Sequence, residues 1–288
     1  MTNNFVSMSP LKREICFYSP PPDGQEPRYE TEDSFLKGWR NYDHNPVPVD
    51  IHDARGHEEE FAMSSHGFAL LRDLDAQHID LAGGCLTCMD SPYMSVVKEL
   101  VASNIPHVIE VIPFDVTVRD AGATGRSQKP VRKVHVDQSE SGAYLRAEHE
   151  LRHRPEVLKD IIDHRIRYRI INFWKPTSGP VSDHPIVMAD SRTVSDEDLV
   201  SVQQVYPHYT GETLAVIYNA AQRYWYWSNM TVREAILLQI YDSDVKNVDG
   251  AKSKGARCAH ASFNLSGSAD ESVLRQNIEI RLIVLSSA

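Results

Sequence analysis

Short β segments separated by turns occupy most of the chain after His107, and this pattern limits the fold more than any other feature. The segment His107–Arg119 alternates between apolar and polar residues and is rich in Val and Ile. Similar segments are expected at Val131–Val136, Arg165–Trp174, Pro185–Ala189, Thr213–Asn219, Ala235–Tyr241, Ala256–Phe263 and Arg275–Leu285. Many short strands with few helices between them favour a sandwich or jelly roll over alternating β and α units.

Three helices are expected to flank these strands. In the first, Ser91–Ser103, Ser91 can cap the helix and Pro92 suits its first position. The other two are Ser139–His153 and Pro155–His164. No linker divides the chain, so we expect a single domain over residues 1–288. It would consist of an irregular N-terminal extension, 1–45, and a core with helical insertions, 46–288.

Charge and hydropathy exclude two classes of partner. The 288 residues carry a formal net charge of −10, so the basic surface that nucleic acid requires is missing. No apolar run approaches the roughly 20 residues of a transmembrane helix. We therefore expect a cytosolic protein with a small-molecule substrate, bound neither to nucleic acid nor to a membrane; a homodimer is left open.

The segment Val134-His135-Val136-Asp137 carries the most informative chemistry. Residues i and i+2 of an extended strand share a face, so His135 and Asp137 can bind one metal ion together. A further histidine would complete the two-histidine, one-carboxylate site of non-haem iron(II) oxygenases. With 13 histidines in the chain, about one His-x-Asp is expected by chance.

His260 is the candidate for the third ligand. It lies in a short strand near the C-terminus, and a jelly roll brings an early and a late strand together. The alternative is a histidine satisfied within the core. A second His-x-Asp, at His78 and Asp80, lacks a clear strand pattern and is interpreted as part of a surface loop.

The last strand presents a polar face. Arg275, Asn277, Glu279 and Arg281 alternate with Ile278, Ile280, Leu282 and Val284. The polar residues could be solvated, or they could line a cavity in which an arginine holds a dicarboxylate through a bidentate contact. Periodicity alone does not decide between the two.

Two other patterns are weaker. The glycine-rich segment Asp120–Arg126 follows a strand but lacks the third glycine and the helix of a dinucleotide-binding loop, so we interpret it as a loop beside the metal site. Among Tyr224–Trp227, alternation would send Trp225 and Trp227 to one face. That pair could form a substrate wall or belong to the core.

Seven motifs in order make the chain similar to a known family. They are Ile51–Gly56, Val134–Ser139, Asn172–Pro176, Trp225–Thr231, Tyr241–Ser243, His260–Phe263 and Arg275–Arg281. The chain resembles the fungal secondary-metabolite hydroxylase/desaturase family of Fe(II)- and 2-oxoglutarate-dependent oxygenases. This resemblance implies a double-stranded β-helix, the cupin-like jelly roll, with His135, Asp137 and His260 as iron ligands.

The resemblance also implies a cofactor and a reaction. 2-Oxoglutarate would bind through Arg281 or Arg275, with Asn277 and Asn172 beside it; Arg281 matches the family more closely. Trp174 would meet the substrate together with Trp225 and Trp227. A terpenoid, meroterpenoid or polyketide would be hydroxylated, desaturated or converted to an endoperoxide with O₂.

The sequence departs from the family pattern at Asn277, where Ser is expected, and at Lys175, where Arg is expected. Two rival functions stay open. One is a cupin-type metalloenzyme that needs no keto acid, and the other is a non-catalytic partner subunit that keeps the fold.

Overall fold

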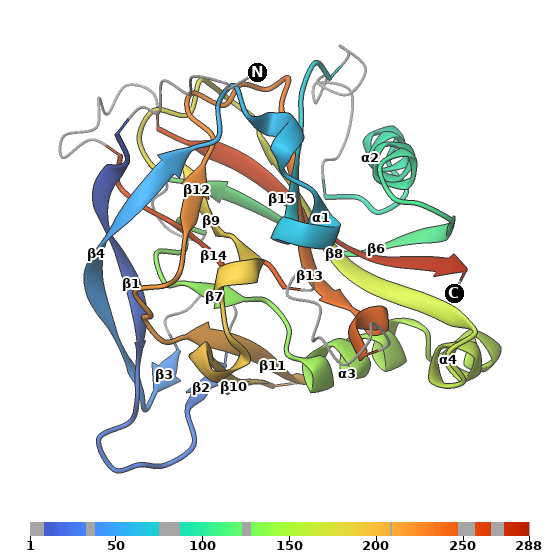
Figure 1. Cartoon of the computed structure of the whole chain (residues 1–288). Coiled ribbons are helices and arrows are strands. Elements are labelled where there is room, and N and C mark those ends of the chain that lie inside the picture. Colours follow the sequence, from blue (N-terminus) through green and yellow to red (C-terminus); the bar gives the residue numbers. More distant parts are fainter. Residues whose placement is uncertain are drawn as a thin grey trace.

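The computed structural model describes residues 9–32, 38–74, 87–122, 128–207, 209–246, 257–265 and 274–287, and two β-sheets dominate it (Figure 1). The strands of the larger sheet are β1 (Leu11–Ser19), β2 (Arg28–Glu30), β3 (Trp39–Arg40), β4 (Asp43–Asp53), β7 (His135–Val136), β9 (Ile186–Ala189), β10 (Leu199–Tyr206), β11 (Tyr209–Val216), β12 (Tyr224–Tyr226) and β14 (His260–Ser262). Their order is β1-β4-β12-β9-β14-β7-β11-β10-β2-β3.

The smaller sheet has the order β5-β13-β8-β15-β6 and contains the longest strands. Their bounds are β5 (Phe68–Leu71), β6 (Val108–Asp120), β8 (Ile166–Pro176), β13 (Ala235–Asp242) and β15 (Gln276–Ser287). Two curled sheets, mostly antiparallel, with few helices are the mainly β architecture that the strand pattern predicts.

The helices lie outside the sheets. They are α1 (Met63–His66), α2 (Pro92–Ser103), α3 (Glu140–Glu150) and α4 (Pro155–Ile162), with 3-10 turns η1 (Glu58–Glu60), η3 (Ser191–Thr193), η4 (Asp196–Asp198) and η5 (Ser243–Lys246). The three expected helices are therefore present as α2, α3 and α4. Within the described ranges, no helix is both long and apolar enough to cross a membrane.

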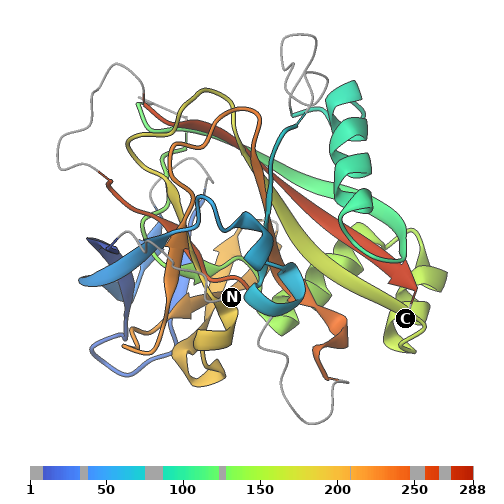
Figure 2. The same ribbon diagram turned by 45° about the horizontal axis from the view of Figure 1, so that its top comes forward.

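The last strand, β15, shows how the two faces of the small sheet differ. Ile278, Ile280, Leu282 and Val284 are buried in a cluster with α2, which covers the outer face of this sheet (Figure 2). The alternate residues turn toward the larger sheet, where Glu279 is only 5% exposed and Asn277 is fully buried. The polar face of the last strand is therefore buried inside the protein and is not solvated.

The N-terminal stretch is more regular than expected. Residues 1–45 were expected to be an irregular extension in which only Arg13–Tyr18 was a possible strand. That strand is present as β1 and is longer, pairing with β4 from Leu11 opposite Ile51 to Ser19 opposite Asp43. The prolines at 20–22 end β1 but do not prevent it, and β2 pairs in parallel with β10. Long-range pairing thus organises a segment whose own sequence is rich in turn residues.

The strand that carries the metal motif is shorter than predicted. Only His135 and Val136 form β7, whereas Val131–Val136 was expected. Just before it, Lys133 forms an isolated bridge with Cys16, and the N–H of Val134 donates to the Cys16 carbonyl. Pairing with β1 therefore takes the place of a longer β7.

Two features of the sequence lie outside the described residues. One is the second His-x-Asp at His78. The other is the centre of the glycine-rich loop, residues 123–127.

Candidate metal and cofactor site

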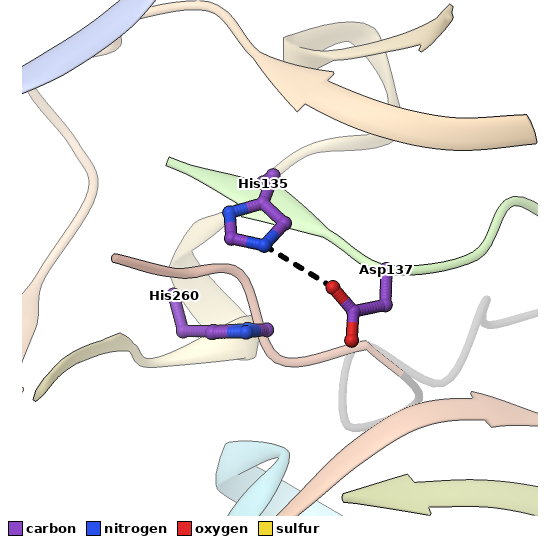
Figure 3. Close-up of side chains that lie close together, drawn as sticks. All are labelled: His135, Asp137 and His260. Atoms are coloured by element: carbon purple, nitrogen blue, oxygen red, sulfur yellow. Dashed lines mark ion pairs between the residues drawn. The ribbon is translucent and has the colours of Figure 1, made fainter. Parts of the chain in front are cut away.

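Two neighbouring strands bring the predicted ligands together. His135 on β7 is paired directly with His260 on β14, and Asp137 follows β7. The ring centroids of the histidines are 4.6 Å apart, and His135 Nε2 lies 3.1 Å from Asp137 Oδ1 (Figure 3). One ligand atom from each residue lies within 4.8 Å of the other two. In the part of the chain that is described, this is the one such cluster of three metal-binding side chains.

Both histidines are oriented by the backbone. His135 Nδ1 lies 2.8 Å from the Lys133 carbonyl, and His260 Nδ1 lies 3.0 Å from the Cys258 carbonyl. A carbonyl oxygen only accepts, so each Nδ1 carries the hydrogen and donates it. Each Nε2 is then left with a lone pair, which is how metal-binding histidines are held in proteins.

Asp137 is held by the small sheet. Its Oδ2 accepts hydrogen bonds from Asn172 Nδ2 at 2.7 Å and from Arg281 Nε at 2.8 Å. Glu279 Oε1 in turn accepts from Asn172 at 3.1 Å and pairs with the Arg281 guanidinium at 2.8 Å. These contacts leave Oδ1 of Asp137 facing His135.

The charges around Asp137 favour a deprotonated carboxylate. Burial alone would raise the pKa of Asp137, but the positive charge of Arg281 outweighs it and lowers that pKa well below its ordinary range. Burial, followed by the neighbouring His135, lowers the pKa of His260. A carboxylate with neutral imidazoles is the protonation state that a divalent metal binds.

Iron(II) suits this donor set. The lone pair of His135 Nε2 faces a carboxylate oxygen at 3.1 Å, and the two repel unless a cation lies beside them. Two ligand atoms bound at right angles, each about 2.1 Å from a metal, would lie about 3 Å apart. Two imidazoles and one carboxylate are the ligands of the non-haem iron oxygenases.

A cavity next to the ligands contains the first of the two candidate arginines. His135, His260, Trp174, Arg275 and Glu279 line it. Arg275 is 4% exposed, and its guanidinium carbon lies 5.5 Å from the centre of the Trp174 ring.

The Arg275 guanidinium is only partly satisfied by protein groups. It donates to the His184 carbonyl and, at 3.2 Å, to Ser262 Oγ. Its buried Nε has no hydrogen-bond partner among the described residues. The side-chain oxygen and nitrogen of Asn277 likewise lack partners in this part of the chain. Buried polar groups are normally hydrogen-bonded, so these atoms are available to water or to a polar ligand.

Arg281 has a different environment. Its guanidinium pairs with Asp137, Asp115 and Glu279, and it also donates to Thr117 Oγ1 at 3.2 Å. Burial would lower the pKa of Arg281, but Asp137 and then Glu279 raise it well above its ordinary value. Carboxylates of the protein therefore already neutralise this arginine. Asn172, expected beside the cofactor, likewise uses its Nδ2 to hold Asp137.

The three candidate tryptophans are not brought together. Only Trp174 lines the cavity beside His135 and His260. Trp225 packs against His52 and Phe61, with ring centroids 5.0 Å away in each case. Trp227 is completely buried and donates to Glu58 Oε1 at 3.0 Å. The substrate wall expected from Trp225 and Trp227 is therefore absent from the lining of this cavity, because Trp227 is a core residue.

Glu279 and Lys133 contact residues of the metal and cofactor site but were not among the site residues expected from the sequence. Glu279 was visible as a member of the polar face of β15, but its contact with Asn172 depends on the pairing of β15 with β8. Lys133 lies two residues before His135 on the metal-binding segment.

A larger cavity lies elsewhere. It measures about 800 Å³ and is lined by residues of α3, α4, β8, β10, β11 and β13, among them Tyr144, Ile162 and Leu214. It shares no residue with the lining of the cavity beside the histidines. The cluster of His135, Asp137 and His260 therefore does not lie at the larger of these two cavities.

Comparison with known proteins agrees with this geometry. A family model described as "Oxidoreductase/YMDC permease-like domain" matches residues 15–285. The hydroxylase/desaturase efuI of Hormonema carpetanum is 27% identical over 84% of each chain. The Fe(II)/2-oxoglutarate-dependent dioxygenase nvfI of Aspergillus novofumigatus is 25% identical over 85% of each chain.

A solved structure shares the fold. The iron and alpha-ketoglutarate-dependent endoperoxidase NvfI superimposes with a TM-score of 0.80 at 22% identity, over 98% of this chain and 100% of the other. This similarity confirms the jelly-roll fold that was expected from the sequence.

Proposed function

This chain belongs to the oxidoreductase family whose model spans residues 15–285, and from that membership we infer that it is an Fe(II)- and 2-oxoglutarate-dependent dioxygenase of secondary metabolism. Relatives of similar length that carry the names hydroxylase/desaturase and Fe(II)/2-oxoglutarate-dependent dioxygenase support the inference. The single observation that carries it is the cluster of His135, Asp137 and His260, each oriented by its own hydrogen bonds.

The residues divide the work of holding the metal. His135 and His260 would each supply Nε2, and Asp137 would supply Oδ1. Asn172 and Arg281 act as positioning residues, because they occupy Oδ2 and prevent the carboxylate from turning. Arg281 also balances part of the negative charge of Asp137 and Glu279.

Arg275 is the better candidate for the distal carboxylate of 2-oxoglutarate. Its buried Nε without a partner, its position in the cavity beside both histidines and the free amide of Asn277 support this role. Burial, and then the positive charge of Arg119, lower the pKa of Arg275, so an anion beside it would be favoured. Arg281, preferred from the sequence, is already paired with three carboxylates.

The reaction consumes O₂ and a small organic substrate. When bound, iron(II) and 2-oxoglutarate would activate O₂, which is the oxidant of the substrate C–H bond. The protein must orient that bond and exclude water. Trp174, 2% exposed in the cavity lining, supports the second task. We propose a terpenoid, meroterpenoid or polyketide substrate and, as product, an alcohol, an alkene or an endoperoxide.

Metal binding and turnover test the proposal together. Anaerobic titration with Fe(II) should show one site in the wild type and none in His135→Ala, Asp137→Ala or His260→Ala. Oxygen-dependent succinate formation from 2-oxoglutarate should be lost in the same variants. Arg275→Met should weaken 2-oxoglutarate binding about ten- to a hundredfold, the value of a charge-assisted hydrogen bond.

The rival functions give different outcomes. A cupin-type metalloenzyme would bind iron but release no succinate, and a non-catalytic subunit would bind no iron. The cytosolic location expected from the sequence stays part of the proposal, and the homodimer stays open. Cell fractionation and size-exclusion chromatography test them.

A further inference from the structure

The face of the large sheet that carries His135 continues into a row of tyrosines. His135 is paired with Ala215 on β11, and Ala215 with Val200 on β10. Every second residue of β10 then faces the same way, which includes Tyr206. Tyr29 on β2 is paired with Gln204, a member of that same set. Tyr29 and Tyr206 therefore share the face of the metal ligand.

The same face extends along β1 in the other direction. Lys133 lies two residues before His135 and is bridged to Cys16. Tyr18, two residues further along β1, is paired with His44 on β4. The ring centroids of Tyr18 and Tyr42 are 5.6 Å apart, and those of Tyr42 and His44 are 5.4 Å apart. We name this surface the tyrosine face; it consists of Tyr18, Tyr29, Tyr42, His44, Lys133 and Tyr206.

Lys133 is the unbalanced charge of the tyrosine face. Its ammonium lies 5.9 Å from the centre of the Tyr29 ring. Among the residues described here, no carboxylate is within ion-pair distance of it. The nearby Arg40, by contrast, pairs with Asp43 at 3.1 Å. A partly buried ammonium without a counter-ion is costly, and an anionic ligand removes that cost.

The charge of Lys133 acts close to the metal ligands. Lys133 lies two residues before His135 on the same strand face, and its main-chain carbonyl accepts the Nδ1 hydrogen of His135. Asp137 itself is already held by Arg281. Burial raises the pKa of Tyr206, and Arg281 and Asp137 lie close enough to contribute to that shift.

We propose that Lys133 binds an acidic oxygen of the organic substrate, a carboxylate or an ionised enol, while Tyr29 and Tyr206 pack against its ring system. This assignment rests on the proposed function and specifies its substrate class as an organic acid with an apolar, cyclic body. It gives the two anions separate cations, Arg275 for 2-oxoglutarate and Lys133 for the substrate.

Binding without turnover tests the proposal. The probes are an isoprenylated benzoic acid and its methyl ester, which differ in the charge that Lys133 would bind and in one methyl group. Calorimetric titration is done without oxygen, on protein loaded with Mn(II) and 2-oxoglutarate. The wild type should bind the acid at least tenfold more tightly than the ester.

The variants separate the charge of Lys133 from its bulk. Lys133→Met should reduce the preference for the acid to parity, and Lys133→Arg should keep most of it. Lys12→Met removes the same charge from an exposed position on β1 and should change nothing. The dissociation constant of 2-oxoglutarate should be the same in all four proteins.

Two results would overturn the assignment. One is equal binding of acid and ester by the wild type, or a preference that survives in Lys133→Met. The other is a loss of 2-oxoglutarate affinity in Lys133→Met without a change in that preference, which would assign the lysine to the cofactor. If Mn(II) and 2-oxoglutarate do not bind at all, the proposed function fails, while the preference for the acid can still be measured on the metal-free protein.

Discussion

Each histidine of the metal site donates its Nδ1 hydrogen to a main-chain carbonyl two residues upstream, Lys133 for His135 and Cys258 for His260. The ring nitrogen that faces the cluster is therefore decided by the backbone and not by a neighbouring acid. Asp137 differs, because side chains from the opposite sheet hold it. The orientation of the two histidines therefore depends on the local backbone, whereas the orientation of the carboxylate depends on how the two sheets pack together.

Arg281→Gln tests the positioning of Asp137. Without the guanidinium, Oδ2 keeps only Asn172, and Glu279 keeps only the longer pair with Arg119 at 3.7 Å. Partners behind metal ligands typically contribute ten- to a hundredfold to metal affinity, so Fe(II) binding should weaken by about that factor. Anaerobic calorimetry measures it. Arg154→Gln, which breaks a half-exposed pair with Glu110, is the control and should bind iron normally. Unchanged iron affinity in a folded Arg281→Gln protein would contradict the positioning role.

His44 should make stability depend on pH. Burial, and then the charges of Lys133 and Arg40, lower its pKa from 6.5 to about 4. Between these values the unfolded chain binds more protons than the folded one, so stability falls as the pH drops from 6.5 toward 4. At 1.36 kcal/mol for each pH unit, the loss is roughly 2 to 3 kcal/mol.

Urea unfolding of the wild type and of His44→Gln, at pH 7 and at pH 4.5, measures this contribution. Carboxylates titrate in both proteins, so the difference between their two pH dependences isolates the histidine. The variant should lose less stability on acidification than the wild type. Equal losses in the two proteins would show that the pKa of His44 in the folded state is the ordinary value.

Among the elements, α2 and β15 follow local rules closely. Ser91 Oγ accepts from the Met94 N–H at 3.2 Å, and Pro92 begins the helix. On β15 the apolar set packs under α2 while the polar set faces the metal site. By contrast, β7 is held to two residues by its neighbours, so its length reflects the sheet and not its own sequence.

Ser91→Ala should destabilise the protein by about 1 kcal/mol, because α2 loses its side-chain cap. Ser95→Ala, at an exposed position within the same helix, is the control and should be neutral or slightly stabilising. Chemical denaturation monitored by circular dichroism compares the two. Equal stabilities would mean that packing of Val97 and Val101 against the small sheet, and not the cap, determines where α2 begins.

Across the whole molecule, the site joins the two sheets. His135, Asp137 and His260 belong to the larger sheet, whereas Asn172, Arg275 and Arg281 belong to β8 and to the β15 segment of the smaller one. A ligand that contacts both groups is bound only when the sheets are packed together. Binding should therefore stabilise the whole fold and not one sheet alone.

Mn(II) with 2-oxoglutarate, each at a hundredfold excess over its dissociation constant, should raise the unfolding free energy by about 2.7 kcal/mol per independent site. Thermal unfolding without oxygen detects this as a single shifted transition. Asp137→Ala should show no shift from the metal. A biphasic transition in the loaded wild type would mean that the two sheets unfold separately.

Local sequence patterns predict the mainly β class and the three outer helices, and they single out His135 and Asp137 as candidate metal ligands. Those features depend on periodicity, capping residues and the i, i+2 geometry of a strand, all of which are local. Tertiary structure alone decided that β1 is a paired strand, that Trp227 is core and that Arg275, not Arg281, is left with an unpaired donor. Each of these depends on a partner far away in the chain, such as Ile51, Glu58 or Asp137. Pairing between distant residues leaves no periodic trace in either segment, which is why only the folded chain reveals it.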